Sequence, residues 1–588
     1  MASHENQLVV LGCSATKFEV DGHVPAVHLY DGPVFRVLRS RLRTHKWSKD
    51  LSIGVLSAKY GLIGAVAPIK TYDQRMTPNR AAFLRARVTS SLKELAEKHQ
   101  RIHFVLGRDY LEAIDCSAIR DRADLEYVDG GIGVKLHRFS NLLASFASTR
   151  RDLREVSRSQ LNQAPLYFLP DWDDFLDVNF DFRKDKFSAE NRSEREQAHS
   201  IELMRPRKLC DGVLVSLAQH LGSKGMLRHL PLTDPELLRP PSVRDHFGLS
   251  TDQWAFGDCG AFSYAGRHDP AISVERAIAV YELYDFDLGA SVDHIPLAEI
   301  VAKSGKRRTL SHEERKRRVS LTRSNAAEFM ALWKARGCKF TPVGIIQGID
   351  AHGYAKQVPK YIEMGYTHLA LGGLVPRGDE EIREIVSEVS RVLKPYRDRP
   401  WLHLLGIFRP KLQPLFRESG VNSFDSASYF RKAWLRSDQN YLGTDDEWYA
   451  ALRVPPASDP STLKRLKKSG EREVTIRHLE RDALSALRRY DAGKLSIESC
   501  LAAVLQYDCL LDRGEFSSGP LREKYHRTLE ARPWKNCTCR VCTEIGIDVV
   551  IFRGYNRNKR RGAHNTLRLF ESVKSKGQSL HAGTNLVQ

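Results

Sequence analysis

The chain has 588 residues, of which 42% are hydrophobic, so it is long enough for more than one domain with a sizeable core. Its charged fraction of 28% and aromatic fraction of 9% exclude a wholly disordered chain, and it contains no uninterrupted apolar run of about 18 residues that could span a membrane. A formal net charge of +19 favours a polyanionic partner such as nucleic acid, and without a visible secretory signal we expect a cytoplasmic protein.

Residues 1–145 show the pattern of a small α/β domain. Short apolar runs at 7–11, 51–57 and 103–107 alternate with amphipathic stretches such as 78–98, which predicts a mostly parallel sheet. Its role is unknown from the sequence, and our hypothesis is a module that docks nucleic acid or a partner. Polar residues follow the first two runs, as expected of an anion or nucleobase site at a sheet's carboxyl edge: Cys13, Ser14, Lys17, Ser57, Lys59 and Tyr60.

The segment 146–209 is densely charged, and we expect it to be a connector that packs partly on the domain that follows. From 210 to the end at 588, strand-like runs alternate with amphipathic helices. This alternation is typical of a (β/α)8 TIM-type barrel, in which catalytic side chains lie at the carboxyl ends of the strands. The runs are DGVLVSL, WAFGDCGAF, DFDLGASVD, FTPVGIIQG, HLALGG, WLHLLGI and NSFDSA.

Residues 436–535 depart from the barrel pattern, because this stretch is helical and basic. It is either a solvated helical face or an inserted nucleic-acid clamp beside the active site. The segments Lys303–Arg318 and Arg553–Arg561 are also basic and leave the same two interpretations open. Under the second interpretation, the three segments form a basic rim around the barrel mouth.

A cluster of three cysteines, Cys537, Cys539 and Cys542, is followed after 22 residues by His564. Three thiolates and one imidazole complete a tetrahedral shell for Zn²⁺, and sulfur ligands favour zinc over Mg²⁺ or Ca²⁺. Because four protein ligands leave no position for water, we predict a structural zinc module over 537–570. The alternative is a group of unpaired thiols.

Four aspartates, Asp258, Asp287, Asp293 and Asp425, each end a strand-like run of the predicted barrel. A single aspartate at such a place is most often a helix cap or a loop hydrogen-bond acceptor. Four such positions in one barrel favour a functional site. Two carboxylates can work as a pair, as in retaining glycosidases, where one traps an oxocarbenium-like centre and another moves a proton.

The zinc pattern, C-x-C-x2-C followed by a distant His-Asn pair, resembles the zinc module of the tRNA-guanine transglycosylase family. Barrel motifs occur in that family's order, and the resemblance covers about residues 210–575. It implies a pentosyltransferase enzyme with a structural Zn²⁺. The motifs are GDCGAFS (257–263), FDLGASVD (286–293), GIIQG (344–348), LGGL (371–374), LLGI (404–407) and NSFDSA (422–427).

The resemblance also implies the roles of individual residues. Asp425 matches the nucleophile that attacks C1′ and expels guanine, and Asp258 matches the general acid/base. Asp293 is expected only to orient its neighbours. The implied base-binding residues are Phe262, which stacks on the base, Asp287, which accepts hydrogen bonds from its N1–H and amino group, Gln347, which reaches its carbonyl, and Gly372 and Gly373, whose backbone allows close approach.

Departures from the family pattern, such as Cys259, Ala261 and Ser263 in the first motif, resemble the branch that acts on DNA. That branch implies exchange of guanine in DNA for a 7-deazaguanine base, 7-cyano-7-deazaguanine (preQ0), with the target nucleotide flipped out of the duplex. Accessory proteins of a DNA modification system are possible partners, and no membrane is implied. Two alternatives stay open: the same exchange on tRNA, and a non-catalytic barrel that binds nucleic acid.

Overall fold

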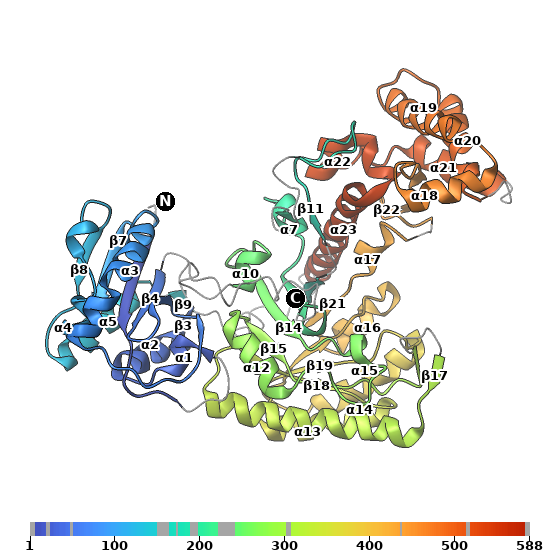
Figure 1. Cartoon of the computed structure of the whole chain (residues 1–588). Coiled ribbons are helices and arrows are strands. Elements are labelled where there is room, and N and C mark those ends of the chain that lie inside the picture. The colour runs from blue at the N-terminus through green and yellow to red at the C-terminus, as the bar shows by residue number, and fades with distance from the viewer. Residues whose placement is uncertain are drawn as a thin grey trace.

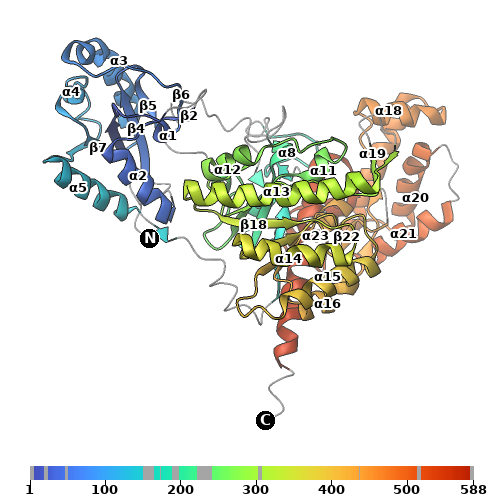
Figure 2. The same cartoon turned by 90° about the horizontal axis from the view of Figure 1, so that it is seen from below.

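An N-terminal α/β unit, a barrel and a helical extension make up the chain (Figures 1 and 2). Among the described residues, no helix is both long and apolar enough to cross a membrane. The computed structural model describes residues 6–18, 24–46, 51–146, 148–149, 164–171, 174–188, 198–220, 242–301, 307–435, 438–512 and 518–582.

The N-terminal unit contains a five-stranded sheet in the order β5-β4-β1-β7-β8. All neighbouring strands run parallel except β4 and β5, so the prediction of a mostly parallel α/β unit is confirmed. Buried apolar side chains lie on both faces of the sheet, beneath the helices. The strands are β1 (Gln7–Gly12), β4 (Leu51–Ser57), β5 (Gly61–Gly64), β7 (Arg101–Val105) and β8 (Asp124–Tyr127), and the main helices are α2 (Pro33–Thr44), α3 (Pro78–Ala96) and α5 (Ile132–Ser145).

Eight parallel strands close into a barrel, which confirms the predicted TIM-type fold. Inward-pointing side chains such as Phe168, Phe256 and Trp401 fill its centre, and a larger apolar core lies between strands and helices. The strands are β10 (Leu166–Pro170), β13 (Gly212–Ser216), β14 (Trp254–Asp258), β15 (Leu288–Ala290), β18 (Thr341–Ile346), β19 (His368–Leu371), β20 (Trp401–Leu404) and β21 (Ser423–Asp425).

The barrel begins before residue 210, where the sequence pattern placed its start, so that boundary is wrong. Strand β10 lies inside the segment 146–209 that the sequence assigned to a connector, and it closes the barrel by pairing with β13 and β21. Phe168 is paired with Asp425, more than 250 residues further along the chain. A run of five residues between charged flanks carries no local sign of so distant a partner.

Helices surround the barrel, and their ends follow ordinary capping rules. Helix α13 begins after Ser311, whose hydroxyl accepts a hydrogen bond from the Glu314 amide, and ends at Gly337 with a left-handed φ of 60°. The barrel helices are α12 (Val274–Leu283), α13 (His312–Arg336), α14 (Ala351–Met364), α15 (Asp379–Leu393) and α16 (Gln413–Glu418).

Beyond the barrel, four helices fill most of the predicted insertion, and the long helix α23 (Gly554–Ala582) follows them. In Figure 1 these helices extend away from the barrel at the upper right, with α23 leading back toward it. The insertion helices are α18 (Pro460–Leu466), α19 (Glu473–Asp491), α20 (Ile497–Asp508) and α21 (Ser518–Ala531).

The basic segment Arg553–Arg561 does not belong to an exposed rim, and that expectation is wrong. None of its five cationic residues is more than 6% exposed. Arg557 forms ion pairs with Asp185 and Asp548, and Arg561 donates hydrogen bonds to backbone carbonyls. Buried cations need such partners, because an isolated charge cannot leave water without a large cost. These side chains hold α23 against the rest of the fold.

Candidate active site

Three aspartates meet at the carboxyl end of the barrel. Asp258 is the last residue of β14, Asp425 is the last residue of β21, and Asp293 follows the end of β15 by three residues. Asp258 and Asp293 have carboxylate oxygens within 4.8 Å of one another. Withdrawal from water, and then the charges of Asp293 and Asp425, raise the pKa of Asp258 to about 8. A pKa of about 8 favours the protonated form of Asp258 at neutral pH.

Asp425 is held through one of its two carboxylate oxygens. Oδ1 accepts hydrogen bonds from the Gly406 amide at 2.8 Å and from His403 Nε2 at 3.1 Å. Because a carboxylate oxygen accepts, the histidine Nε2 carries the proton that points at Asp425. His403 Nδ1 lies 2.8 Å from the Ser423 hydroxyl, which also accepts the Trp401 indole N–H. Oδ2 accepts no hydrogen bond from the described residues. One oxygen is fixed and the other is available for attack.

Both carboxylate oxygens of Asp293 accept hydrogen bonds from neighbouring side chains. The Cys259 thiol donates to Oδ1 at 2.8 Å and the Gln347 amide donates to Oδ2 at 2.6 Å. The Tyr264 hydroxyl contacts both the Cys259 sulfur and the Asp293 backbone carbonyl. Burial raises the pKa of Asp293, as it does that of Asp258.

The carbonyl oxygen of Gln347 is a buried acceptor without a hydrogen bond among the described residues. Two glycines make room for this side chain. A Cβ atom at Gly372 would come within 2.3 Å of Gln347 Nε2, and one at Gly373, where φ is +70°, within 2.7 Å of Oε1. The structure therefore brings the glycine pair and the glutamine together.

Phe262 lies just after Asp258, on the short helix α11 (Ala261–Tyr264), and is 51% exposed. The turn before it requires glycine at 260, where φ is +78° and a Cβ atom would come within 2.2 Å of the Ser216 hydroxyl. The Gly260 amide donates to Asp258 Oδ2 at 2.9 Å. This exposed ring beside the acid suits a flat ligand.

Asp287 is not at this site, which contradicts its expected role in base binding. It precedes β15 instead of following it, so it lies at the opposite end of the barrel from Asp425. Its Oδ2 accepts hydrogen bonds from the Ala255 amide at 2.9 Å and from Arg244 at 2.8 Å, and the pair is almost fully buried. The motif FDLGASVD contains a whole strand between its two aspartates, and only Asp293 reaches the carboxyl end.

Two residues of the site were missed by the sequence interpretation. His403 lies inside β20, where it alternates with Leu402 and Leu404 and points the same way as Trp401. A polar residue at an inward position of a barrel strand could have indicated His403 as a site residue. Cys259 was noted only as a departure from the family motif, yet it is a hydrogen-bond donor to Asp293.

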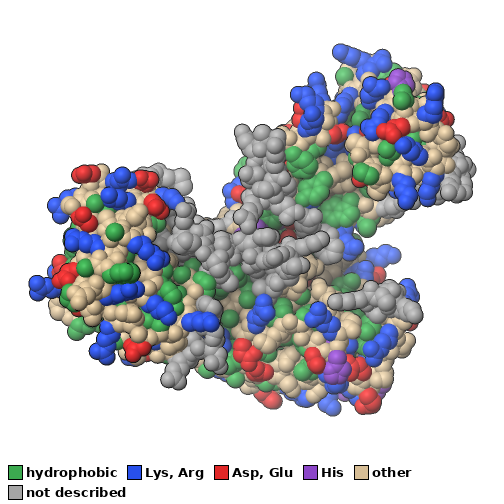
Figure 3. Space-filling view, viewed as in Figure 1, with side chains coloured by type: hydrophobic (Ala, Val, Ile, Leu, Met, Phe, Trp, Pro, Cys, Tyr) green, Lys and Arg blue, Asp and Glu red, His purple; other side chains and the backbone are tan. Residues whose placement is uncertain are grey.

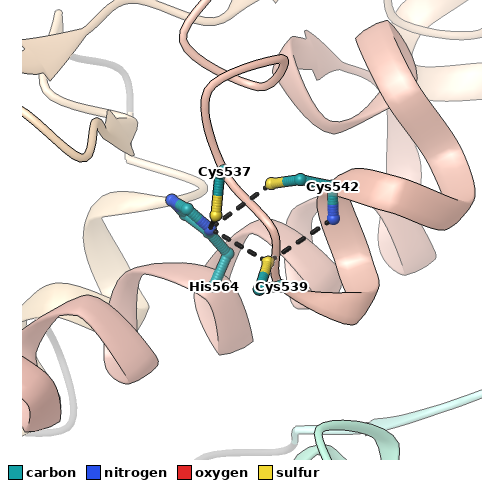
Figure 4. A group of neighbouring side chains, drawn as sticks. All are labelled: Cys537, Cys539, Cys542 and His564. Carbon is teal, nitrogen blue, oxygen red and sulfur yellow. Dashed lines mark hydrogen bonds between the residues drawn. The ribbon is translucent and has the colours of Figure 1, made fainter.

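The predicted zinc ligands form one compact, buried group (Figure 4). The sulfur atoms of Cys537, Cys539 and Cys542 lie 3.7, 3.4 and 3.4 Å from His564 Nδ1. With zinc bonds of about 2.3 Å to sulfur and 2.0–2.1 Å to nitrogen, tetrahedral geometry separates such atoms by about 3.6 Å. The donor set and its spacing therefore fit a metal ion such as zinc.

The surroundings of this group fix its ligands. His564 Nε2 donates to the Leu442 carbonyl at 2.7 Å, which leaves Nδ1 free for a metal. The Tyr441 ring stacks on His564, with centroids 4.2 Å apart. The group joins the start of α22 (Arg540–Ile545) to α23, so it ties the helical extension together.

A second group, Asp171, Asp174 and His199, also has ligand-type atoms within 4.8 Å of one another. Its His199 Nε2 and Asp174 Oδ1 atoms are 2.8 Å apart as a buried ion pair, and Ser200 donates to the other Asp174 oxygen. Mutual pairing accounts for this cluster, which lies just beyond the carboxyl end of β10.

Exposed cations gather on the helical insertion, in agreement with the space-filling view (Figure 3). Lys467 and Arg477 share Glu473, so part of this charge is neutralised locally. In Lys303–Arg318, residues before 307 lie outside the described part, and Arg318 is buried. The exposed cationic residues around α18 and the start of α19 are Lys464, Arg465, Lys467, Lys468, Arg472, Arg477 and Arg481.

Comparison with known proteins gives two matches. A family of unknown function (DUF6884) matches residues 8–140, which is the N-terminal unit. The DNA-guanine transglycosylase of Salmonella montevideo is 36% identical to this chain over 411 residues, which cover 69% of this chain and 96% of that protein.

Proposed function

Since the chain belongs to the DNA-guanine transglycosylase family and is a guanine transglycosylase enzyme, we propose that it exchanges guanine in DNA for a 7-deazaguanine base, preQ0. The observation that carries the proposed mechanism is that Asp258 and Asp425 both end barrel strands at the carboxyl end, with Asp425 held only through Oδ1 among the described residues. A non-catalytic barrel would not need a carboxylate held on one side and open on the other.

In the first half of the reaction, Asp425 Oδ2 attacks C1′ and forms a covalent ester. The bond from C1′ to guanine breaks, and its electron pair leaves with the base. Asp258 donates a proton to the departing guanine. In the second half, Asp258 removes a proton from the incoming base, which attacks C1′ and releases Asp425. His403 and the Gly406 amide steady the nucleophile in both halves.

Base recognition falls to Asp293 in place of Asp287. Asp293 lies beside Asp258, and Cys259 and Gln347 fix its orientation. The free Gln347 carbonyl oxygen can accept a hydrogen bond from the base, and the exposed Phe262 ring can stack on its face. Both substrates use the same pocket in turn, because guanine must leave before its replacement attacks.

DNA reaches this pocket only with the target nucleotide flipped out of the stack, because duplex packing hides C1′. The exposed cations of the insertion suit the flanking phosphates, with an affinity that falls as salt rises. Cys537, Cys539, Cys542 and His564 would hold a zinc ion that stabilises the fold and takes no part in the exchange.

The choice of DNA over tRNA is tested by incubating the enzyme with DNA or tRNA in the presence of preQ0. The nucleosides are then released by digestion and identified by mass spectrometry. We expect the deazaguanine nucleoside in DNA and none in tRNA. Incorporation into tRNA alone would contradict the proposal, and so would release of guanine into water without incorporation.

The rate of covalent adduct formation should depend on the protonation of Asp258. Because the raised pKa of about 8 keeps Asp258 protonated below that pH, the rate at saturating DNA should be level up to about pH 8. Above it, the rate should fall about tenfold per pH unit, as the acid form is lost.

In the Asp293→Asn variant, the loss of a neighbouring negative charge lowers the pKa of Asp258, so the fall should begin at a lower pH. Asp287→Asn is the matched control and should leave the profile in place. A profile that rises through pH 8, or that shifts equally in both variants, would contradict this role of Asp258.

A further inference from the structure

The N-terminal unit contains a second cluster of reactive and charged side chains, remote in sequence from the barrel site. It lies where β1 and β4 end side by side, an arrangement in which parallel sheets commonly bind ligands. The loop after β1 is fixed by backbone hydrogen bonds to the segment before α2, from Asp31 to Thr16 and from Phe18 to Leu29. These bonds place Lys17 next to Tyr30.

Two lysines meet over one aromatic ring. The Lys17 ammonium lies 4.4 Å from the centre of the Tyr72 ring, and the Lys59 ammonium lies 5.6 Å from it. Among the described residues, neither ammonium has a carboxylate within ion-pair distance, and the nearby Asp31 is already paired with Arg36 and Arg39. Two cations beside the same ring, neither paired with a carboxylate among the described residues, favour an anion at this edge of the sheet.

Beneath the lysines, the hydroxyls of Tyr30, Ser57 and Tyr72 form a buried chain with 2.8 Å between successive oxygens. The Ser57 oxygen already accepts the amides of Lys59 and Tyr60, so it has no lone pair left. Ser57 can therefore only donate to the two tyrosines, which also contact one another. The two tyrosine hydroxyls can share only one hydrogen bond between them, so one O–H remains without an acceptor within the described residues. Burial raises the pKa of Tyr30, so its hydroxyl stays protonated as a donor.

An oxygen-rich anion satisfies both features, because it accepts the spare hydrogen and neutralises both lysines. A terminal phosphate suits the site better than a diester within a DNA strand. Its three oxygens sit at the end of the molecule and can reach hydroxyls below the surface. Phe18, the residue after Lys17, is 45% exposed and offers a ring on which a base can stack.

We propose that the carboxyl edge of β1 and β4 binds the terminal phosphate of a nucleotide, through Lys17, Lys59 and the Tyr30–Tyr72–Ser57 hydroxyls. The partly exposed Cys13 thiol lies at the same edge, 3.5 Å from the Ala58 amide nitrogen and 3.1 Å from the Tyr110 hydroxyl. A bound nucleotide would cover it. This site is separate from the barrel chemistry, and its failure would leave the proposed transglycosylase function untouched.

Calorimetric titration of the full chain tests the proposal, with AMP, GMP, inorganic phosphate, adenosine and a DNA duplex that lacks terminal phosphates as probes. We expect a nucleoside monophosphate to bind, inorganic phosphate to bind more weakly, and adenosine not to bind. Lys17→Gln with Lys59→Gln should weaken monophosphate binding at least tenfold, and Tyr30→Phe should weaken it severalfold. Lys98→Gln, at the opposite edge of the sheet, is the control.

Alkylation of Cys13, followed by peptide mass spectrometry, gives an independent readout, because the monophosphate should slow it in the wild type and not in the double lysine variant. The proposal is overturned if no monophosphate binds at millimolar concentration. Binding that is unchanged in the double lysine variant would also overturn it. Equal competition by the duplex without terminal phosphates would assign the lysines to the DNA backbone instead.

Discussion

The Asp425→Asn variant should lose base exchange by at least about 10⁴-fold, the scale seen when a covalent nucleophile is removed. An amide cannot form the ester at C1′, although it can keep the hydrogen bonds from Gly406 and His403 through its oxygen. The fold should therefore be intact, and DNA binding should stay within a few fold of wild type. The measurement is the single-turnover rate of preQ0 incorporation, with binding measured separately.

Asp287→Asn is the matched control for this variant, since it makes the same chemical change in a barrel aspartate at the opposite end. It removes the charge that pairs with Arg244, so we expect lower stability, by a few kcal/mol for a buried pair. Its exchange rate at a temperature where it is folded should stay within a few fold of wild type. Equal loss in both variants would contradict the placement of the active site.

The Cys539→Ser variant should lose its metal and much of its stability. The four ligands are buried and connect α22 to α23, and structural zinc sites contribute roughly 10 kcal/mol or more to the folding of small domains. We expect one zinc per chain in the wild type and less than a tenth of that in the variant. The unfolding temperature should fall by about 10 °C or more.

Cys500→Ser makes the same substitution at another buried cysteine, on α20 and outside the metal group. It should keep one zinc per chain. A chelator should reproduce the effect of Cys539→Ser in the wild type and add little to the variant. A wild-type protein without metal, and with unchanged unfolding after chelator treatment, would contradict a structural zinc site.

The sequence predicted the architecture well wherever the signal was local. The alternation of strands and helices and the ligand spacing of the cysteine cluster are both short-range patterns, and both reappear in the structure. Strand β10 was missed because its membership of the barrel depends on pairing with β21 at the far end of the domain. The basic residues of α23 were misjudged because charge alone does not reveal burial against Asp185 and Asp548.

The sequence indicated most of the residues near the site, but not the end of the barrel at which each side chain lies. Asp258 and Asp425 end their strands and Gln347 follows the end of β18, all at the carboxyl end of the barrel, whereas Asp287 lies at the opposite end. Asp287 and Asp293 both border β15, and a strand of three residues is enough to place them at opposite ends of the barrel. The pairing of Leu288 with Phe256 and Thr341 shows that the strand begins just after Asp287. Asp287 therefore lies at the amino end of the strand.

Locating the covalent intermediate tests most directly the proposed mechanism, in which Asp425 is the nucleophile. The wild-type enzyme is incubated with guanine-containing DNA, denatured and digested with protease and nuclease, and the peptides are sequenced by mass spectrometry. We predict a nucleotide attached to Asp425, which disappears when preQ0 is added before denaturation. A nucleotide attached to Asp258 or Asp293, or no adduct at any pH at which exchange proceeds, would contradict the account.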